Sequence, residues 1–394
     1  MKRTKYLEKL LKLKDLHIIK VITGIRRCGK STLLSQFQEE LLEKGVKSNQ
    51  IISINLEALE FEDLLEYHAL YNYIVDKINS NYMNYIFIDE IQIVPEFQKA
   101  LDSLFIRKNV DLYVTGSNAM ILSGELATRL SGRYIEFNIL PFSFSEYIED
   151  KGITDLNLGI KGYMRDGGFP FAISLNDREV YTEYMRGIYN SVLVKDIINR
   201  LGSSNIDVID SVLRYICDTV GNLITPKKIA DTLTSMNRKT NSTSVEKYLT
   251  AMENSYLFYK VRRYNISGKQ WLVRQCKYYL TDLGIRSLFK EFNSNDTGHL
   301  LENIVAIELI RRSYSIGVGV LGDKEVDFVV TKDDEFSYIQ VAWSVVDENV
   351  LKREITPLLN IKDNYPKYLL TMDPLPFDVK GIHHINIVEW LNER

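Results

Sequence analysis

Cysteine and long apolar runs are scarce in this sequence. The three cysteines in 394 residues are odd in number and far apart, so they predict neither a disulfide framework nor a zinc site, and they are typical of the reducing cytoplasm. No apolar run has the length of a transmembrane helix, so we expect a soluble, cytoplasmic protein without a membrane partner. Lysines interrupt the leucines of residues 1–16 and no cleavage site follows, which predicts a surface helix and not a signal peptide.

Net charge is also small, at −3, and by itself it indicates little about partners. The distribution of the charge is more informative. Residues 226–286 contain 12 Lys or Arg and four Asp or Glu, so this segment carries 12 − 4 = +8 and the remainder of the chain carries −3 − 8 = −11. A basic segment inside an acidic protein points to a polyanionic partner.

The length of the chain predicts two or three domains, because one core rarely serves so many residues. In the first 141 residues, short apolar runs alternate with helical patterns, which predicts an α/β fold with a parallel sheet covered by helices. The apolar runs cover residues 17–24, 50–56, 84–90, 110–117 and 134–140. The helical patterns between them cover residues 30–44, 62–78, 96–108 and 120–130.

The next segments differ from this alternation. Residues 142–204 are mostly helical and end in a linker, which predicts a helical lid. Three helical patterns and a hairpin that turns near Ser267-Gly268 follow within residues 205–291, and this order is typical of a winged helix-turn-helix. The predicted helices of that segment cover residues 208–220, 226–233 and 242–254. Residues 292–394 combine helices and strands and are predicted to form a small α/β domain.

The motif that points most directly to chemistry is Gly24–Ser31, which matches G-x-x-x-x-G-K-[ST] between an apolar run and a helical pattern. Its glycines let backbone N–H groups surround a phosphate at a helix N-terminus. Lys30 is expected to reach the β- and γ-phosphates of ATP, and the Ser31 hydroxyl to bind Mg²⁺. One arginine of the loop is expected to contact phosphate, and the sequence leaves open which one. The residues predicted to bind ATP are Gly24, Arg26, Arg27, Cys28, Gly29, Lys30, Ser31 and Thr32.

Cys28 lies within this loop, beside cationic residues and a helix N-terminus, both of which favour a thiolate. We therefore expect a bulky thiol reagent to block nucleotide binding, and ATP-Mg to protect the thiol. A Cys28→Ala variant is expected to resist the reagent.

An acidic pair, Asp89-Glu90, ends the third apolar run. At the end of a buried strand, Asp89 is expected near the Mg²⁺ ion and Glu90 beside a water molecule that attacks the γ-phosphate. The fourth run ends in polar residues, of which we prefer Asn118 to Ser117 as the one that touches the γ-phosphate or orients the water.

Two arginines further along the chain, Arg129 and Arg133, are candidates for an arginine finger. A guanidinium suits this role because it spreads its charge over phosphate oxygens. Either arginine could act within its own chain or on a neighbouring copy, and the second arrangement would require a homo-oligomer.

Several segments together resemble a known family, the archaeal and bacterial AAA-like ATPases that carry a C-terminal domain of unknown function. The segments are GIRRCGKSTLL, YIFIDEIQ, TGSNAMILSGELATRLSGRY, LPFSFSEY, GGFP, HLLENIVAIEL and EVDFV. The resemblance covers nearly the whole chain. It implies an ASCE-type sheet, in which the strand that ends at Ser117 separates the P-loop strand from the Asp89 strand. It also implies a winged helix and a final domain similar to the PD-(D/E)xK nuclease fold.

The nuclease-like pattern is incomplete in this sequence. Glu302 and Asp327 fill the first two acidic positions, but Gln340 stands in place of the third acid and Ala342 in place of the lysine. Because carboxylates hold the metal and the lysine stabilises charge on the scissile phosphate, we expect a degenerate module that binds DNA or a partner. Lys324 or Lys332 could supply the missing cation.

In this interpretation, the basic segment of residues 226–286 would bind DNA. Its residues would contact phosphates without reading sequence, the first three at or near the recognition helix and the others on the wing. The predicted DNA-binding residues are Arg238, Lys239, Lys247, Arg262, Arg263, Lys269 and Arg274, with Lys277 also on the wing. The sequence therefore predicts an ATPase whose nucleotide state controls DNA engagement. An ATP-gated protein-binding scaffold with slow turnover is the alternative, followed by an ATP-dependent nuclease.

Overall fold

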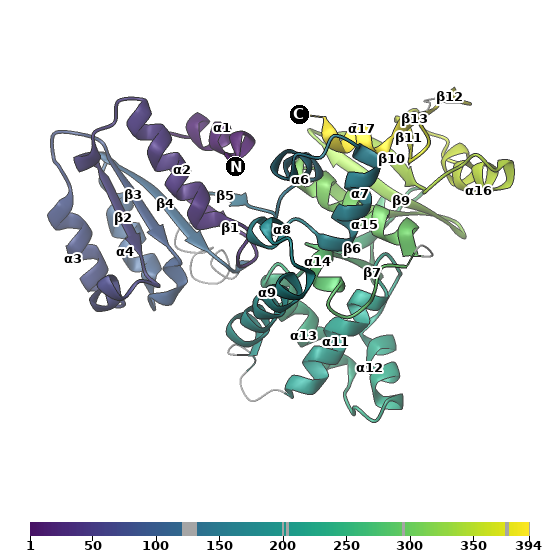
Figure 1. The fold of residues 1–394 in the computed structure, drawn as a ribbon, viewed down its shortest axis with the longest axis horizontal. Coiled ribbons are helices and arrows are strands. Elements are labelled where there is room, and N and C mark those ends of the chain that lie inside the picture. Colours follow the sequence, from purple (N-terminus) through teal and green to yellow (C-terminus); the bar gives the residue numbers. More distant parts are fainter. Residues whose placement is uncertain (120–131, 199–200, 202–204, 294–295, 375–377, 394) are drawn as a thin grey trace. The chain divides into compact units, whose positions relative to one another are not determined.

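The structure is a computed structural model, and it describes residues 1–119, 132–198, 201, 205–293, 296–374 and 378–393. Contacts between residues divide the chain into two compact units. The first unit contains Met1–Leu140 with Asn254–Tyr256, and the second contains Pro141–Glu253 with Leu257–Arg394. Figure 1 shows the chain coloured from purple at the N-terminus to yellow at the C-terminus.

The first unit contains a five-stranded parallel sheet, and each of its strands falls within one of the predicted apolar runs. Every residue of β1, β3 and β4 is buried, which is why these strands read as continuous apolar runs. The order across the sheet is β2 (Ile51–Asn55), β3 (Asn84–Asp89), β4 (Val110–Gly116), β1 (Ile19–Thr23) and β5 (Tyr134–Asn138). The order confirms that β4 separates the P-loop strand from the Asp89 strand.

Helices accompany this sheet at three of the four predicted places. The α-helices are α1 (Thr4–Lys12), α2 (Lys30–Glu43), α3 (Tyr67–Lys77) and α4 (Phe97–Phe105), with short 3₁₀ turns η1 (Ser48–Gln50), η2 (Leu59–Leu64) and η3 (Ile91–Ile93). Helix α1 packs beside α2, and α3 beside α4 (Figure 1). The helix predicted at residues 120–130 lies outside the described residues.

One of these helices differs from the sequence prediction, and one agrees with it. The helix predicted over residues 62–78 is divided, because the Glu66 carboxylate accepts from the backbone N–H groups of His68 and Ala69 and starts α3 there. The surface helix predicted near the N-terminus is present as α1, whose buried face carries Tyr6, Leu7 and Leu10.

The second unit begins with helices α6 (Phe144–Lys151), α7 (Leu156–Asp166), α8 (Pro170–Ser174) and α9 (Arg178–Ser191), followed by the π-helix η5 (Val192–Ile198). The Gly167-Gly168 pair lies between α7 and α8. Gly167 has a φ of +70°, and a Cβ there would lie 1.9 Å from the Asp282 carboxylate. That carboxylate accepts from the Gly168 N–H at 2.6 Å, so these glycines allow the helical segment to contact a residue far along the chain.

Three helices and a hairpin follow in the predicted order. They are α11 (Ile206–Asp218), α12 (Pro226–Ser235), α13 (Ser242–Asn254), β6 (Phe258–Asn265) and β7 (Gln270–Leu280). The turn between β6 and β7 contains Ser267 and Gly268, as the sequence predicted. Further helices described in this unit are α14 (Leu283–Arg286), α15 (Thr297–Arg311), α16 (Glu348–Leu359) and α17 (Ile387–Asn392). Among the described residues, no helix combines the length and apolar character needed to cross a bilayer.

The hairpin is part of a larger mixed sheet of eight strands. Its order is β12 (Asp378–Val379), β13 (Ile382–Asn386), β11 (Lys367–Thr371), β10 (Glu335–Val341), β9 (Lys324–Lys332), β8 (Ser315–Leu321), β6 and β7. Strand β6 pairs in parallel with β8, with Tyr264 opposite Gly319. The predicted boundary between residues 291 and 292 therefore crosses a continuous sheet. Local sequence patterns do not reveal such long-range pairing, so the hairpin resembled an independent wing.

Candidate functional site

The P-loop connects β1 to α2 and turns tightly at two glycines. Gly24 has a φ of +143°, and a Cβ there would lie 2.2 Å from the backbone oxygen of Ile139. Gly29 has a φ of +101° and caps the N-terminus of α2. Both conformations favour glycine strongly, so the two motif glycines shape the loop that a phosphate would enter.

Lys30 lies beneath the loop and is 4% exposed. Its ammonium donates to the backbone oxygens of Gly24 at 3.0 Å and Ile25 at 3.3 Å, and it lies 3.9 Å from the Glu90 carboxylate. The loop thus fixes a positive charge at the N-terminus of α2. Ser31 and Thr32 follow on the first turn of the helix, and both are exposed.

Thr115 connects the carboxylate of Asp89, the predicted metal ligand, to the backbone of Glu90, the predicted base, and sequence reasoning missed it. This residue of β4 donates its hydroxyl to the Asp89 carboxylate and accepts from the Glu90 N–H at 2.9 Å. A threonine in an otherwise apolar strand end was the available signal. Glu90 adopts a φ of +56°, a left-handed conformation that costs about 1–2 kcal/mol in a residue with a Cβ. Such strain is common where a side chain must point into a site.

Gln92 is a second residue that the sequence did not single out. Its side-chain amide donates to the Glu90 carboxylate and, at 3.4 Å, to the Ser117 hydroxyl. The signal was its place two residues after the acidic pair. Asn118, our preferred residue at this strand end, is 2% exposed. The structure therefore places Lys30, Glu90 and the end of β4 together at the carboxyl edge of the sheet.

The arginines of the loop and the candidate fingers are placed differently from one another. Arg26 pairs with Glu57 at 3.3 Å, whereas Arg27 is exposed, with a φ of +67°. Arg129 lies outside the described residues. Arg133 precedes β5 and pairs with Asp102, and its backbone oxygen accepts from Ile19 at the start of β1.

That position excludes Arg133 as a finger for its own P-loop. The five residues from Ile19 to Thr23 extend along β1 for about 17 Å. Arg133 thus lies at the amino edge of the sheet, while the P-loop lies at the carboxyl edge. The sequence analysis missed this position because it did not take into account the direction of the strand that follows Arg133. That direction decides at which edge of the sheet the arginine lies.

The donor set fits a magnesium nucleotide. Ser31 offers a hydroxyl oxygen and Asp89 a carboxylate oxygen, which are hard ligands of the kind that Mg²⁺ prefers. Across the described part of the chain, no group of three or more His, Cys, Asp or Glu residues could hold a metal ion. An ion that takes one or two protein ligands and completes its shell with phosphate oxygens and water matches this arrangement.

The predicted thiolate at Cys28 is wrong. The thiol is fully buried, and burial raises its pKa more strongly than Lys30 and Arg3 lower it. Its sulfur lies beneath Gly24, where an added Cβ would approach it to 3.1 Å. The loop's cations and the helix N-terminus do not compensate for the lost hydration of a buried thiolate.

We accordingly expect a thiol reagent such as DTNB to label the folded protein slowly. All three cysteines are buried, so labelling requires local opening, and denaturant is expected to release three reactive thiols. Absorbance of the released thionitrobenzoate measures both rates. Rapid labelling of one thiol in the native chain, lost in Cys28→Ala, would contradict the buried position.

Arg3 is a further residue of the site that the sequence did not indicate. Its guanidinium is 4% exposed and donates to the backbone oxygens of Cys28 at 3.3 Å and Leu140 at 2.9 Å. It therefore joins the N-terminal segment to the P-loop and to the end of the β5 segment. Arg3 lies under the loop as a positioning residue.

Replacing Arg3 with Met is expected to weaken ATP binding about tenfold, because hydrogen bonds from a charged donor contribute about 1.5–3 kcal/mol each. Isothermal titration calorimetry measures the change, and Arg3→Lys is expected to restore part of it. Lys2→Met is the control, because Lys2 is half-exposed and pairs with Glu40 on the surface. Equal ATP affinity in Arg3→Met and Lys2→Met would show that the loop does not need Arg3.

The nuclease-like residues also come together, within the second unit. Glu302 lies on α15, Asp327 on β9 and Gln340 on β10, and all three are buried. The Asp327 N–H donates to the Gln340 side-chain oxygen at 3.3 Å, and the Gln340 amide donates to Glu354 at 3.0 Å. The side-chain oxygen and the side-chain N–H group of Gln340 thus both have hydrogen-bond partners within the protein.

Lys277 completes this cluster, although the sequence placed it on the surface of a wing. Its ammonium is 2.7 Å from a Glu302 oxygen and 2.7 Å from a Glu325 oxygen, and its side chain is 4% exposed. The Tyr279 hydroxyl donates to the same Glu302 oxygen at 2.6 Å. The prediction that Lys277 is exposed is wrong because the second half of β7 is covered while the first half is not. Lys332, one of the two lysines considered for this place, is exposed.

The cluster balances burial against charge. Burial raises the pKa of Asp327 well above its usual range, and the charge of Glu302 raises it further. At Glu302, Lys277 and hydrogen bonds outweigh burial and lower the pKa. Burial disfavours the charged form of Lys277, but the surrounding carboxylates outweigh it and raise that pKa. The result is a buried ion pair between Lys277 and Glu302 beside Asp327, a carboxyl group whose pKa is raised.

Most of the predicted DNA-binding residues lie at the surface of the second unit. Arg263 is half-buried and donates to Gln275 at 2.8 Å. Arg238 donates to the backbone oxygen of Asp207 at 3.3 Å. The exposed members are Arg238, Lys239, Lys247, Arg262, Lys269 and Arg274.

Comparison with known proteins places these features in a family. The model of an AAA domain matches residues 17–148, and that of a domain of unknown function, DUF8612, matches residues 158–296. The second match spans most of the predicted lid and the three helices with the hairpin, and it ends close to the start of the predicted final domain.

Two relatives and one solved structure cover most of the chain. An uncharacterized protein of Haemophilus influenzae is 39% identical over 99% of this chain and 98% of its own length, and uncharacterized protein MJ1544 of Methanocaldococcus jannaschii is 28% identical over 86% and 77%. The Walker-type ATPase paby2304 of Pyrococcus abyssi aligns with a TM-score of 0.53 over 73% of this chain and 95% of its own, at 16% identity, which indicates a shared fold. The chain therefore belongs to the family of AAA-domain proteins that includes the Haemophilus influenzae protein.

Proposed function

We propose that this protein is a Mg-dependent ATPase. The observation that carries the proposal is the convergence of Lys30, Asp89 and Glu90 at one edge of the sheet, with Thr115 hydrogen-bonded to the Asp89 carboxylate and to the Glu90 backbone N–H. The AAA domain match supports ATP binding at the same loop. Magnesium, when bound with the nucleotide, would neutralise charge on the transferred phosphate.

The residues of the chain would then divide the remaining work. The Lys30 ammonium would donate hydrogen bonds to phosphate oxygens in place of the backbone oxygens of the loop. Ser31 and Asp89 would hold the metal. Glu90 accepts the proton of the attacking water, and the Gln92 amide fixes the orientation of that carboxylate. We retain Asn118 as a residue that orients the water, because it is buried at the end of the adjacent strand.

An arginine finger remains part of the proposal. Arg129 is the candidate for either arrangement, and Arg133 for action on a second copy of the chain. Phosphate release from ATP, measured per chain over a range of protein concentrations, tests both. Activity that rises with concentration would support a homo-oligomer, and constant activity would restrict the finger to Arg129 of the same chain or to none.

We further propose that nucleotide state controls engagement of DNA. The domain arrangement would be an ATPase core (residues 1–141), a helical lid (142–204), a winged helix (205–291) and a degenerate PD-(D/E)xK-like domain (292–394), with the last two sharing one sheet. The exposed basic residues on and near the hairpin support a phosphate contact. The Gln340 amide donates a hydrogen bond to the Glu354 carboxylate, so both side chains are engaged within the protein. This contact favours a binding role over nuclease chemistry in the final domain. An ATP-gated protein-binding scaffold is the second candidate.

Duplex binding is expected to weaken steeply with salt, with a slope of about −0.9 per phosphate contact in a plot of log affinity against log salt. Charge reversal of Arg262 and Arg274, both exposed on the hairpin, is expected to weaken binding to all duplexes alike and to make the slope shallower. Fluorescence anisotropy with and without ATP measures both quantities.

Reversal of Lys352 and Lys362 provides the matched control, since both are exposed lysines outside the basic segment. If the full chain binds neither duplex nor single-stranded DNA in any nucleotide state, the scaffold replaces the DNA proposal and the ATPase proposal stands unchanged.

A further inference from the structure

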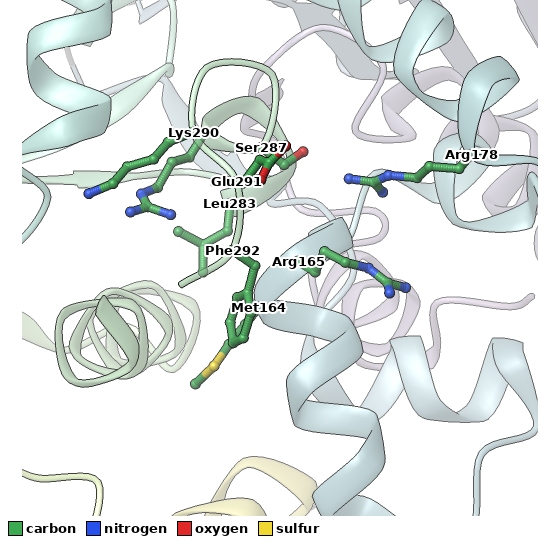
Figure 2. A pocket seen from close by; sticks show the side chains of 9 residues that line it. Met164, Arg165, Arg178, Leu283, Ser287, Lys290, Glu291 and Phe292 are labelled. Carbon is green, nitrogen blue, oxygen red and sulfur yellow. The ribbon is translucent and has the colours of Figure 1, made fainter. Parts of the chain in front are cut away.

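A cavity of about 210 Å³ opens within the second unit, away from the residues assigned above. Figure 2 shows Lys290 and Arg178 on opposite sides of it, with Leu283 and Phe292 between them. Its lining comes from the end of α7, the start of α9, and the segment that begins with α14. The residues that line it are Met164, Arg165, Arg178, Leu283, Arg286, Ser287, Lys290, Glu291 and Phe292.

Four cations of this lining are held in place by two carboxylates. Asp166 is bonded to Arg165 at 2.7 Å and to Arg178 at 2.7 Å, although the two arginines lie on different helices. Asp296 holds the other pair, which consists of Arg286 at 2.5 Å and Lys290 at 2.7 Å. The positions of the cationic groups are therefore fixed before any ligand arrives, which lowers the entropic cost of binding.

These contacts leave donors for a ligand. A guanidinium carries five N–H groups. Arg165 uses its Nε and Nη2 atoms for Asp166, and Arg178 uses its Nη1 atom. Even with Glu291 counted beside Asp166 and Asp296, four cations face three carboxylates. The cavity therefore combines a positive excess with planar donors that match phosphate oxygens.

Apart from Ser287, the remaining lining is apolar. Met164 and Leu283 are buried, and Phe292 is 40% exposed, so an aromatic ring is available to a ligand in the same cavity. Inorganic phosphate would not use these groups, whereas a phosphate ester with a flat organic part would contact both sets. A volume of about 210 Å³ admits one such unit and not a long chain.

We propose that this cavity binds a nucleoside monophosphate unit, with the phosphate on the arginines and the base against Phe292. The unit is either a free mononucleotide or one nucleotide of a single strand. The proposal does not depend on ATP hydrolysis at the P-loop, because none of the lining residues belongs to the first unit.

The test uses the full chain with the substitution Lys30→Ala, which suppresses nucleotide binding at the P-loop. The buffer contains EDTA, which removes the Mg²⁺ that the P-loop site would use. AMP is titrated by isothermal calorimetry, and we expect saturable binding below millimolar concentration. Arg178→Ala in the same background is expected to weaken it about tenfold or more, since a bond to a charged donor is lost. Inorganic phosphate is expected to bind more weakly than AMP.

Arg214→Ala is a closely matched control. Arg214 is 50% exposed, pairs with Asp210 at 2.6 Å and covers the ring of Phe289 at 4.4 Å. Arg178 is 51% exposed, pairs with Asp166 at 2.7 Å and covers the ring of Tyr181 at 4.5 Å. Arg214 does not line the cavity, so its replacement is expected to leave AMP affinity within about twofold, an additivity typical of independent sites.

The outcomes separate the two sources and the contrary case. A short single-stranded oligonucleotide that competes with AMP and binds more tightly would identify the unit as part of a strand, and absence of competition would identify a free nucleotide. No AMP binding at millimolar concentration, equal loss in Arg178→Ala and Arg214→Ala, or inorganic phosphate binding as tightly as AMP would overturn the proposal.

Discussion

Replacing Glu90 with Gln will leave ATP binding intact and reduce turnover by about 10²–10⁴-fold, the contribution expected of a positioned general base. The amide keeps the shape of the carboxylate but cannot accept the proton of the attacking water. Lys30→Ala will instead abolish measurable binding, because it removes the ammonium fixed beneath the loop. Calorimetry with ATP-Mg and a phosphate-release assay separate the two effects.

Glu96→Gln is a suitable control for the glutamate. Glu96 shares the left-handed backbone of Glu90, with a φ of +54°, but it is exposed and pairs with Lys99 outside the site. Its replacement is expected to leave turnover unchanged. If Glu90→Gln turned over ATP as fast as Glu96→Gln, Glu90 would not be the general base. Another group beside Asp89 and Thr115 would then have to accept the proton of the attacking water.

Lys277→Met will destabilise the second unit by about 3–5 kcal/mol, the usual cost of removing one partner of a buried ion pair. Glu302 and Glu325 would both lose the ammonium at 2.7 Å, and the neutral Tyr279 hydroxyl that donates to Glu302 does not replace the lost charge. A large effect on folding is expected because three carboxyl groups share this region of the sheet. Urea unfolding of the full chain, followed by circular dichroism and fluorescence, measures the change.

Two further variants make this result specific. Lys332→Met removes an exposed lysine on β9 and is expected to change stability by less than about 0.5 kcal/mol. Lys277→Met combined with Glu302→Gln is expected to recover part of the loss, because the uncompensated charge disappears together with its partner. Stability of Lys277→Met equal to that of Lys332→Met would show that the pair contributes nothing net.

The parts of the site that the sequence predicted are those encoded locally. A strand, a glycine loop and a helix start follow one another along the chain, so Gly24, Gly29 and Lys30 could be placed from their spacing alone. The buried apolar runs likewise predicted the five strands of the first sheet. Asp89 and Glu90 were found because an acidic pair at a strand end stands out in an apolar run.

The parts that the sequence missed depend on contacts between distant residues. Arg3 reaches the P-loop from the N-terminus, and Thr115 reaches Asp89 from a neighbouring strand. No local pattern encodes either contact. The error at Cys28 has a different cause, since neighbouring charges were visible in the sequence but the depth of burial was not, and burial dominates the pKa.

The parallel pairing of β6 with β8 has a practical consequence for fragments of this protein. A fragment that stops after residue 291 would retain β6 but lose the strand that satisfies its outer backbone groups. An uncovered strand edge of this kind pairs with other chains, so such a fragment would aggregate on expression. Fragments cut at the junction between the two compact units, near residue 141, would keep both sheets whole, and crystallisation or recombination of parts should start from that division.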